Sequence, residues 1–214
     1  MYNYEILGAA GQSCIRDAKE KLDVCAKLEI DLHSIRVGNL CSFIGKIQGF
    51  SESQCNRLQW AGFFHDLGKY FLAPDILFKK EYLSAQEKAT IQNHAVIGAK
   101  KYMHFATSVG CYFDREVFCS ILQHHERFDG HGYPSGMPGR ALDLSSQIIS
   151  LCDYVEALSA DRCYRSAFPA EKVAEMVECE AGRAWPLSVA DLFLKNQKEC
   201  FNVLQAPLDH RRIS

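Results

Sequence analysis

The spacing of the apolar residues constrains the fold more than any other feature of this sequence. Apolar side chains recur every three or four positions through most of the chain, and almost no segment shows the apolar–polar alternation of a half-buried strand. Of the 214 residues, 48% are hydrophobic and 23% are charged, which is typical of a folded globular chain and excludes a disordered one. The sequence therefore predicts an all-α fold with a sizeable core, built as one full domain.

Capping and loop patterns divide the chain into helices. Residues 51–54 and 84–87 have the capping-box form, which predicts two helix starts. Residues 128–143 are rich in glycine and proline and predict a loop, and loops of this length in compact domains are usually functional. The predicted helices cover residues 13–27, 30–47, 52–67, 85–102, 114–127, 144–159, 170–182 and 187–203.

Charge and hydropathy exclude several classes of protein. The chain has 24 basic and 26 acidic residues, so no global positive field recruits a nucleic-acid polymer or an anionic membrane. No stretch approaches the roughly 18 consecutive apolar residues of a membrane span, and residues 1–5 do not begin a secretory signal. We therefore expect a cytoplasmic protein without a membrane span. The ten cysteines form no C-x-x-C pair and are interpreted as reduced, buried small hydrophobes.

Several polar residues interrupt otherwise apolar helices. His65 and Asp66 follow the apolar run 60–64, where a buried carboxylate is costly without a cation. Glu29 lies four residues before His33, so the two side chains share one face of a helix. The other interruptions are His94, the pair His124 and His125, and Asp153. Each has an ordinary structural explanation when it is taken alone, such as a core histidine or a capped pair.

Taken together, these residues predict a buried polynuclear metal site. Imidazole and carboxylate ligands suit iron, manganese, zinc and related divalent ions, and such cations offset the cost of burying carboxylates. Two or three ions, about 3.5–4 Å apart, hydrolyse phosphate esters through a bridging hydroxide. Lys69, one turn after Asp66, is placed to meet a phosphate oxygen, although taken alone it is better explained as a solvated helix-end lysine. The sequence has no P-loop, nucleophile elbow, dinucleotide-binding fingerprint or H-E-x-x-H motif.

Three ordered motifs resemble the HD-GYP family of HD metal-dependent phosphohydrolases. They are H-D-L-G-K at 65–69, H-H-E-R-F-D-G-H-G-Y-P at 124–134 and D-Y-V-E-A-L-S-A-D-R-C-Y-R at 153–165. The resemblance covers roughly residues 25–200 and implies an HD-GYP-type helical bundle around a buried polynuclear metal site. It predicts a helical lead-in at 1–24, the catalytic domain at 25–203 and a tail at 204–214.

The resemblance also implies an activity and roles for residues. Members typically hydrolyse cyclic di-GMP to pGpG or GMP with two or three divalent ions, here iron or manganese ahead of zinc, nickel or others. Asp66 would bridge ions, and Glu29 stands where three-metal members carry an extra ligand. Lys69 would hold the scissile phosphate. The implied substrate contacts beside Lys69 are Tyr133, Arg162 and Arg165, and the implied metal ligands are Glu29, His33, His65, Asp66, His94, His124, His125 and Asp153.

Three positions depart from the family pattern. Gln147 stands where Arg is common, Glu156 where a second Asp is common, and Cys163 where Pro is usual. None of them removes a ligand, so they bear on substrate affinity more than on metal binding.

Other functions stay open at this point. One alternative is an HD-type phosphohydrolase of another cyclic dinucleotide or nucleotide. Another is a non-catalytic cyclic di-GMP-binding or adaptor protein. The GYP loop, residues 128–139, is also a candidate surface for docking a diguanylate cyclase domain.

Overall fold

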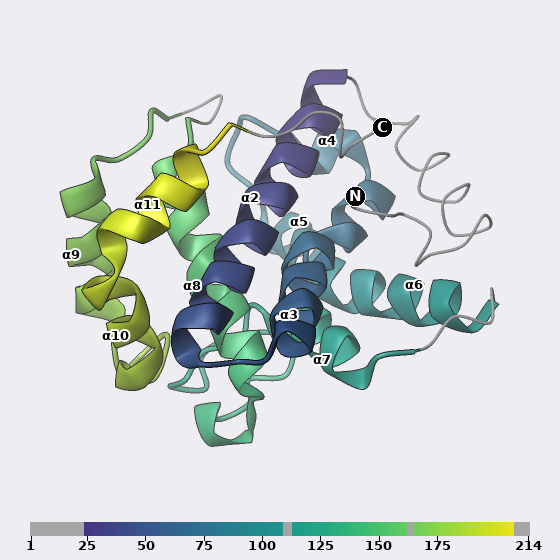
Figure 1. Cartoon of the computed structure of the whole chain (residues 1–214). Coiled ribbons are helices and arrows are strands. Elements are labelled where there is room, and N and C mark those ends of the chain that lie inside the picture. Colours follow the sequence, from purple (N-terminus) through teal and green to yellow (C-terminus); the bar gives the residue numbers. More distant parts are fainter. Residues whose placement is uncertain (1–23, 109–112, 162–164, 208–214) are drawn as a thin grey trace.

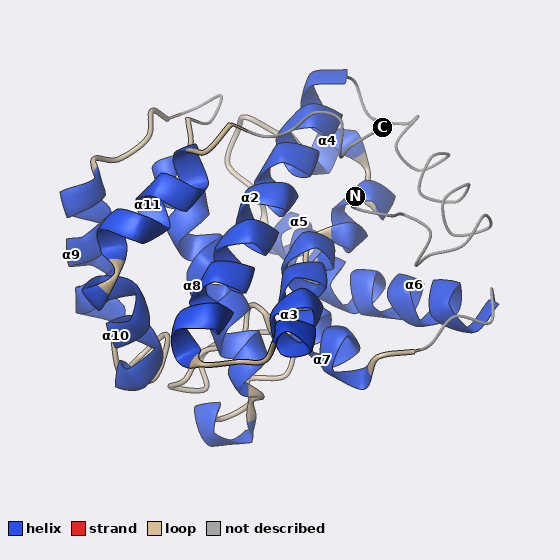
Figure 2. Ribbon diagram, in the orientation of Figure 1, coloured by secondary structure: helices blue, strands red, loops and turns tan. Residues whose placement is uncertain are grey.

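The chain folds into a helical bundle, shown in Figure 1. The computed structural model describes residues 24–108, 113–161 and 165–207. All regular elements among these residues are helices, with one isolated bridge between Ala181 and Trp185, so the all-α prediction is confirmed (Figure 2). The α-helices and the two 3-10 helices (η) are α2 (Val24–Gln48), α3 (Glu52–Phe64), η2 (Leu67–Phe71), α4 (Pro74–Leu77), α5 (Ala85–Gln92), α6 (His94–Ser108), α7 (Arg115–Gln123), η3 (Gly139–Ala141), α8 (Leu144–Ser159), α9 (Ala170–Glu180), α10 (Leu187–Lys195) and α11 (Gln197–Gln205).

Helices α2 and α3 pack closely because two glycines face each other where they cross. A Cβ atom placed on Gly62 would lie 3.0 Å from the Cα atom of Gly38 and 2.9 Å from the Sγ atom of Cys41. Ser51 begins α3 with the predicted capping box, in which its side chain accepts from the Gln54 N–H and the Gln54 side chain accepts from the Ser51 N–H. The close crossing brings the middle of α2 next to the end of α3.

Helix α8 passes through the bundle and buries much of its length. Ile148, Ile149 and Val155 have no exposed surface, and each such side chain contributes about 1.5–3 kcal/mol by leaving water. The C-terminal helices α9, α10 and α11 cover α8 and α2 on one side (Figure 1). Trp185 fixes this layer, since its indole N–H donates to the Ser150 hydroxyl at 3.2 Å. This contact ties the C-terminal layer to α8, the helix that carries Asp153 and Glu156.

Some predicted helix boundaries are wrong. The break expected between residues 27 and 30 does not exist, because α2 runs unbroken through it. The helix expected from 85 onward is broken at Asn93, and the helix expected over 187–203 is broken at Asn196. The helix expected to reach residue 127 ends at Gln123. Hydrophobic spacing alone does not report these breaks and ends.

The predicted burial of the cysteines is confirmed only in part. Five of the described thiols are buried, but Cys179 is exposed, so the expectation of burial is wrong there.

The structure also bears on membrane association and on the ends of the chain. Among the described residues, no helix is long and apolar enough to cross a membrane. Residues 1–23 of the predicted lead-in and residues 208–214 of the predicted tail lie outside the described residues, so the domain boundaries stay predictions.

Gly62→Ala tests the close helix crossing. The added methyl group must displace either Cys41 or the backbone at Gly38, and overpacking of this kind costs about 1–3 kcal/mol. We expect chemical denaturation to show that loss of unfolding free energy, whereas Lys88→Ala on the exposed face of α5 stays within about 0.5 kcal/mol of wild type. A Gly62→Ala protein as stable as wild type would contradict the crossing.

Candidate metal centre

Four donor atoms converge where α2, α3 and α8 meet. The Nε2 atom of His33 lies 3.2 Å from Nε2 of His65 and 3.1 Å from Oδ1 of Asp153. It also lies 3.5 Å from Oδ2 of Asp66, which is 3.4 Å from Nε2 of His65. Atoms that share an ion at about 2.1 Å are separated by roughly 3.0–3.4 Å. The spacing of this first group therefore fits one divalent ion.

A second group lies on the other side of Asp66. The Nε2 atom of His94 is 3.2 Å from Nε2 of His124 and 3.3 Å from Oδ1 of Asp66. His125 completes this group, since His94, His124 and His125 can bring one nitrogen each within 4.8 Å of one another. Asp66 thus turns one oxygen toward each group, which is the arrangement of a carboxylate that bridges two ions.

The unsatisfied oxygen of Asp66 supports this interpretation. Its side chain is 2% exposed, and among the described residues no group donates a hydrogen bond to Oδ1. The His94 nitrogen nearest to it has no proton to donate when the ring is neutral, because the ring proton lies on Nδ1. A buried carboxylate oxygen without a donor is costly, and a cation removes that cost. The residues present therefore fit a divalent metal centre.

Helix ends orient three of the ligand imidazoles. The Nδ1–H groups of His65, His94 and His124 donate to the carbonyl three residues earlier, at 2.6, 2.7 and 2.8 Å respectively. The acceptors lie in the last turns of α3, α5 and α7, where carbonyl oxygens have no partner within the helix. Because Nδ1 is engaged by a carbonyl oxygen, Nε2 is the ring nitrogen that faces the centre and is available to a metal ion. The break at Asn93 is therefore part of the site.

The pKa values of the histidines differ between the two ligand groups. Burial disfavours protonated His65, yet Asp66 and Asp153 outweigh burial and raise the pKa of His65 to about 10. In the second group nothing outweighs burial, which lowers the pKa of His125 to about 3 and holds that of His124 well below its usual range. Burial alone would raise the pKa of Asp66, but Lys69 and His65 hold it well below its usual range. The centre therefore presents ionised Asp66 in the first group and neutral His124 and His125 in the second.

A close backbone approach holds η2, which contains Gly68 and Lys69 of the motif, beside the second group. A Cβ atom on Gly68 would lie 1.9 Å from the His94 carbonyl oxygen, so only glycine lets η2 approach α6 this closely. This approach sets Asp66 and Lys69 against His94. The sequence motif H-D-L-G-K thus has a steric reason for its glycine.

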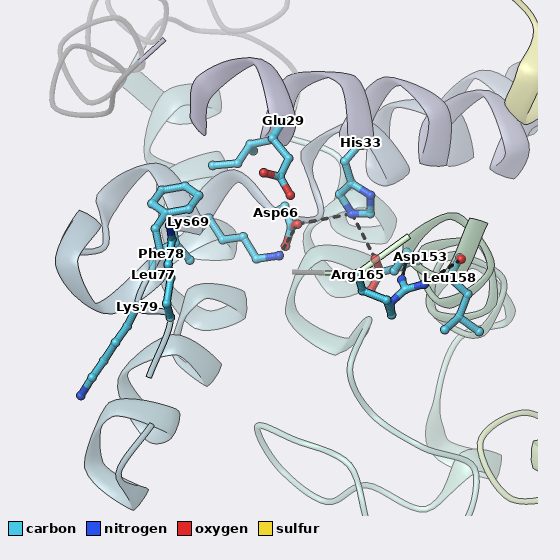
Figure 3. A pocket seen from close by; sticks show the side chains of 13 residues that line it. Glu29, His33, Asp66, Lys69, Leu77, Phe78, Lys79, Asp153, Leu158 and Arg165 are labelled. Atoms are coloured by element: carbon cyan, nitrogen blue, oxygen red, sulfur yellow. Dashed lines mark hydrogen bonds and ion pairs between the residues drawn. The ribbon is translucent and has the colours of Figure 1, made fainter. Parts of the chain in front are cut away.

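A cavity of about 660 Å³ opens on the first group (Figure 3), within the size range of ligand pockets. Figure 3 shows Phe78 and Lys79 on one side and Arg165 and Leu158 on the other, with Asp66 between them. The cavity is lined by Glu29, Ile30, His33, Asp66, Lys69, Leu77, Phe78, Lys79, Lys80, Asp153, Ala157, Leu158 and Arg165.

The structure places the remaining predicted site residues as follows. The Nζ atom of Lys69 lies 2.5 Å from Oδ2 of Asp66, beside the first group. Glu29 lines the cavity but joins neither ligand group, so its role with a third ion stays a prediction. Arg165 lines the cavity and also donates to the carbonyl oxygens of Ala157 at 2.6 Å and Leu158 at 3.3 Å, which caps the end of α8. Arg162 lies outside the described residues.

Tyr133 supports a ligand. Its ring stacks on that of His125, with centroids 4.6 Å apart at 28°, and its backbone N–H donates to the His125 carbonyl oxygen at 3.1 Å. It is not among the residues that line the cavity, so its contact with substrate stays a prediction.

Sequence reasoning missed the roles of two buried carboxylates. Glu126 is 2% exposed and accepts from the N–H groups of Ser135 at 2.7 Å and Met137 at 3.0 Å. It therefore holds the GYP loop. Glu156, noted only as a departure from the family, is 1% exposed and contacts Nδ1 of His33. The sequence did contain a signal for this role, because Glu156 lies three residues after Asp153 and therefore on the same face of α8.

Gln147, the other described departure from the family pattern, also ties down this loop region. Its side-chain amide donates to the carbonyl oxygens of Leu142 at 3.1 Å and Gly139 at 3.4 Å. It thus fixes the segment that precedes α8.

Comparison with known proteins identifies the family. The model of the HD domain matches residues 14–185, so the chain belongs to the HD-domain family. A cyclic di-GMP phosphodiesterase of Thermotoga maritima is 31% identical over 85% of this chain and 48% of its own length. A 3′3′-cGAMP-specific phosphodiesterase of Vibrio cholerae is 32% identical over 80% of this chain and 38% of its own. The chain thus spans half or less of the length of these curated relatives.

Solved structures show the same fold. Bd1817, an HD-GYP-type protein from Bdellovibrio bacteriovorus, superposes with a TM-score of 0.64 at 18% identity, over 92% of this chain and 65% of its own. A cyclic GMP-AMP-specific phosphodiesterase of Vibrio cholerae gives 0.58 at 16% identity, over 85% of this chain and 48% of its own. The fold that the motif resemblance implies is therefore confirmed.

Asp66→Asn tests the shared carboxylate. We expect manganese to raise the melting temperature of the wild-type protein, because an ion at 100 times its dissociation constant stabilises the native state by about 2.7 kcal/mol. The variant keeps the shape but loses the charge on both sides, so its melting temperature should not respond to the metal. Asp191→Asn, on the exposed side of α10, is the matched control. An Asp66→Asn protein with the wild-type shift would contradict the site.

Proposed function

We propose that the chain is a metal-dependent phosphodiesterase that hydrolyses cyclic dinucleotides, with cyclic di-GMP as the first candidate substrate. The observation that carries the proposal is one buried carboxylate, Asp66, shared between two ligand groups at the wall of a cavity that also contains Lys69 and Arg165. The names of the relatives support it, since they include phosphodiesterases of cyclic di-GMP and of 3′3′-cGAMP.

The chain's own residues supply binding and orientation. Divalent ions at such a centre activate water and offset charge on a phosphate ester. Lys69 is half-buried beside Asp66, so its ammonium can meet a phosphate oxygen without moving far. Holding a cation where negative charge grows lowers the barrier most in a site with little water. Lys69 is therefore proposed to stabilise the phosphate during cleavage.

The cavity suits a molecule with two phosphates and two bases. Its lining includes Lys79, Lys80 and Arg165 in addition to Lys69, and Lys79 is paired with Glu87 at 2.6 Å. Figure 3 shows Lys79 and Arg165 on opposite sides of Asp66. Phe78, which is 37% exposed, presents an aromatic ring that a base can stack on. These features support a dinucleotide over a mononucleotide as the substrate.

A different cyclic dinucleotide is the second candidate substrate. The relatives that act on 3′3′-cGAMP favour it, and nothing about the described cavity selects guanine over adenine. The donor set of both ligand groups is complete, which supports an enzyme over a non-catalytic adaptor. Iron or manganese as the native metal, a diguanylate cyclase partner at the GYP loop and a cytoplasmic location stay predictions.

Turnover and metal content measured on one anaerobic preparation test the proposal. We expect two or three metal ions per chain by elemental analysis and conversion of cyclic di-GMP to pGpG or GMP by chromatography. Asp66→Ala should lose both. Lys69→Met should keep its metal but lose roughly 10²–10³-fold in kcat, because one stabilising group is removed. Lys172→Met, on the exposed face of α9, should behave as wild type.

The same assay separates the alternatives. Faster cleavage of 3′3′-cGAMP or cyclic di-AMP in a competition panel would assign the second candidate. A metal-loaded protein that binds but cleaves none of the panel would contradict the enzymatic proposal. Absence of metal in the wild-type protein would contradict the ligand assignment itself.

A further inference from the structure

His33 is held differently from the other ligand imidazoles whose Nδ1 contacts are known. His65, His94 and His124 each use a carbonyl oxygen at a helix end. His33 lies in the middle of the long helix α2, where the carbonyl oxygens of the previous turn accept hydrogen bonds from the helix itself. Its Nδ1 atom is therefore left to a side chain, and the carboxylate of Glu156 contacts it.

Glu156 is buried but has a second charged neighbour. Only 1% of its surface is exposed. Its Oε2 atom faces His33, and its Oε1 atom lies 3.5 Å from a guanidinium nitrogen of Arg36, whose side chain is 34% exposed. A buried carboxylate is tolerated when such partners offset the loss of water. Both carboxylate oxygens of Glu156 thus face a nitrogen-bearing side chain.

Two residues of α2 contact two residues of α8. His33 and Arg36 lie three residues apart on α2, and Asp153 and Glu156 lie three residues apart on α8, so each pair shares a helix face. Asp153 meets Nε2 of His33 at 3.1 Å, while Glu156 meets Nδ1 of the same ring. One helix therefore supplies both a ligand of the first group and the group behind a neighbouring ligand.

We propose that Glu156 is a positioning residue for the ion held by the first ligand group. It fixes the ring of His33 and keeps the proton on Nδ1, so that Nε2 points at Asp66 and Asp153. A carboxylate behind an imidazole also makes the ring a stronger donor than a carbonyl does. The proposal rests on the metal centre of the proposed function and adds that the two ion positions differ in affinity, because only the first contains His33.

Metal affinity, measured apart from catalysis, tests this role. Metal-free wild type and Glu156→Gln are titrated with manganese against a colorimetric chelator under anaerobic conditions. The amide keeps the size of the side chain and removes its charge. We expect one of the two binding steps to weaken about 10–100-fold in the variant and the other to stay unchanged. Cobalt-loaded protein should show a shifted absorption band, which reports a changed ligand field at the ion.

Controls separate positioning from general stability. Glu175→Gln makes the same chemical change on the exposed face of α9 and should match wild type in both binding steps. The melting temperature of the metal-free Glu156→Gln protein should lie close to that of wild type, which would show that its fold is intact. Glu156→Asp keeps the charge, so it should bind more tightly than Glu156→Gln if charge behind His33 is what matters.

Three results would overturn the inference. Equal affinity of wild type and Glu156→Gln at both steps would show that the contact is only structural. Equal weakening of both steps would show a general effect on the bundle. A wild-type protein that binds no metal would contradict the metal centre and the inference together, whereas metal binding without turnover would contradict only the proposed phosphodiesterase.

Discussion

The structure is organised around one carboxylate that lies out of water between two sets of imidazoles. Asp66 is almost fully buried, and its two oxygens point in different directions, one toward His33 and His65 and the other toward His94. Lys69 balances part of its charge, but one oxygen receives no hydrogen bond from the described residues. Two cations, one on each side, account for this arrangement in a way that ordinary packing does not.

Close glycine contacts, helix-end carbonyl oxygens and helix α8 position the residues around that carboxylate. Glycines at crossing points let backbones approach, as Gly68 does against the His94 carbonyl. Ends of α3, α5 and α7 offer carbonyl oxygens that orient histidines. Helix α8 contributes Asp153 as a ligand and Glu156 behind His33. The helix ends and breaks that the sequence predicted poorly are thus the same features that position the ligand histidines.

Much of this was predictable from the sequence, and the limits are physical. Apolar spacing indicated the helices, and the rarity of histidine and aspartate in apolar runs indicated the centre; His33, His65, Asp66, His94, His124, His125 and Asp153 do lie together. The break at Asn93 was not predictable from the spacing of apolar residues. It lets Nδ1 of His94 bond to the Ile91 carbonyl oxygen while Nε2 faces Asp66, and the position of Asp66 is a tertiary feature. The positions of Glu126 and Glu156 also depend on tertiary contacts.

A crystal structure of the anaerobically prepared, manganese-loaded protein, with anomalous scattering recorded at the manganese edge, tests the central claim most directly. The account predicts at least two anomalous peaks, one on each side of Asp66 and about 3.5–4 Å apart. One peak would lie among His33, His65 and Asp153, and the other among His94, His124 and His125. A single peak, or peaks that Asp66 does not contact, would contradict it.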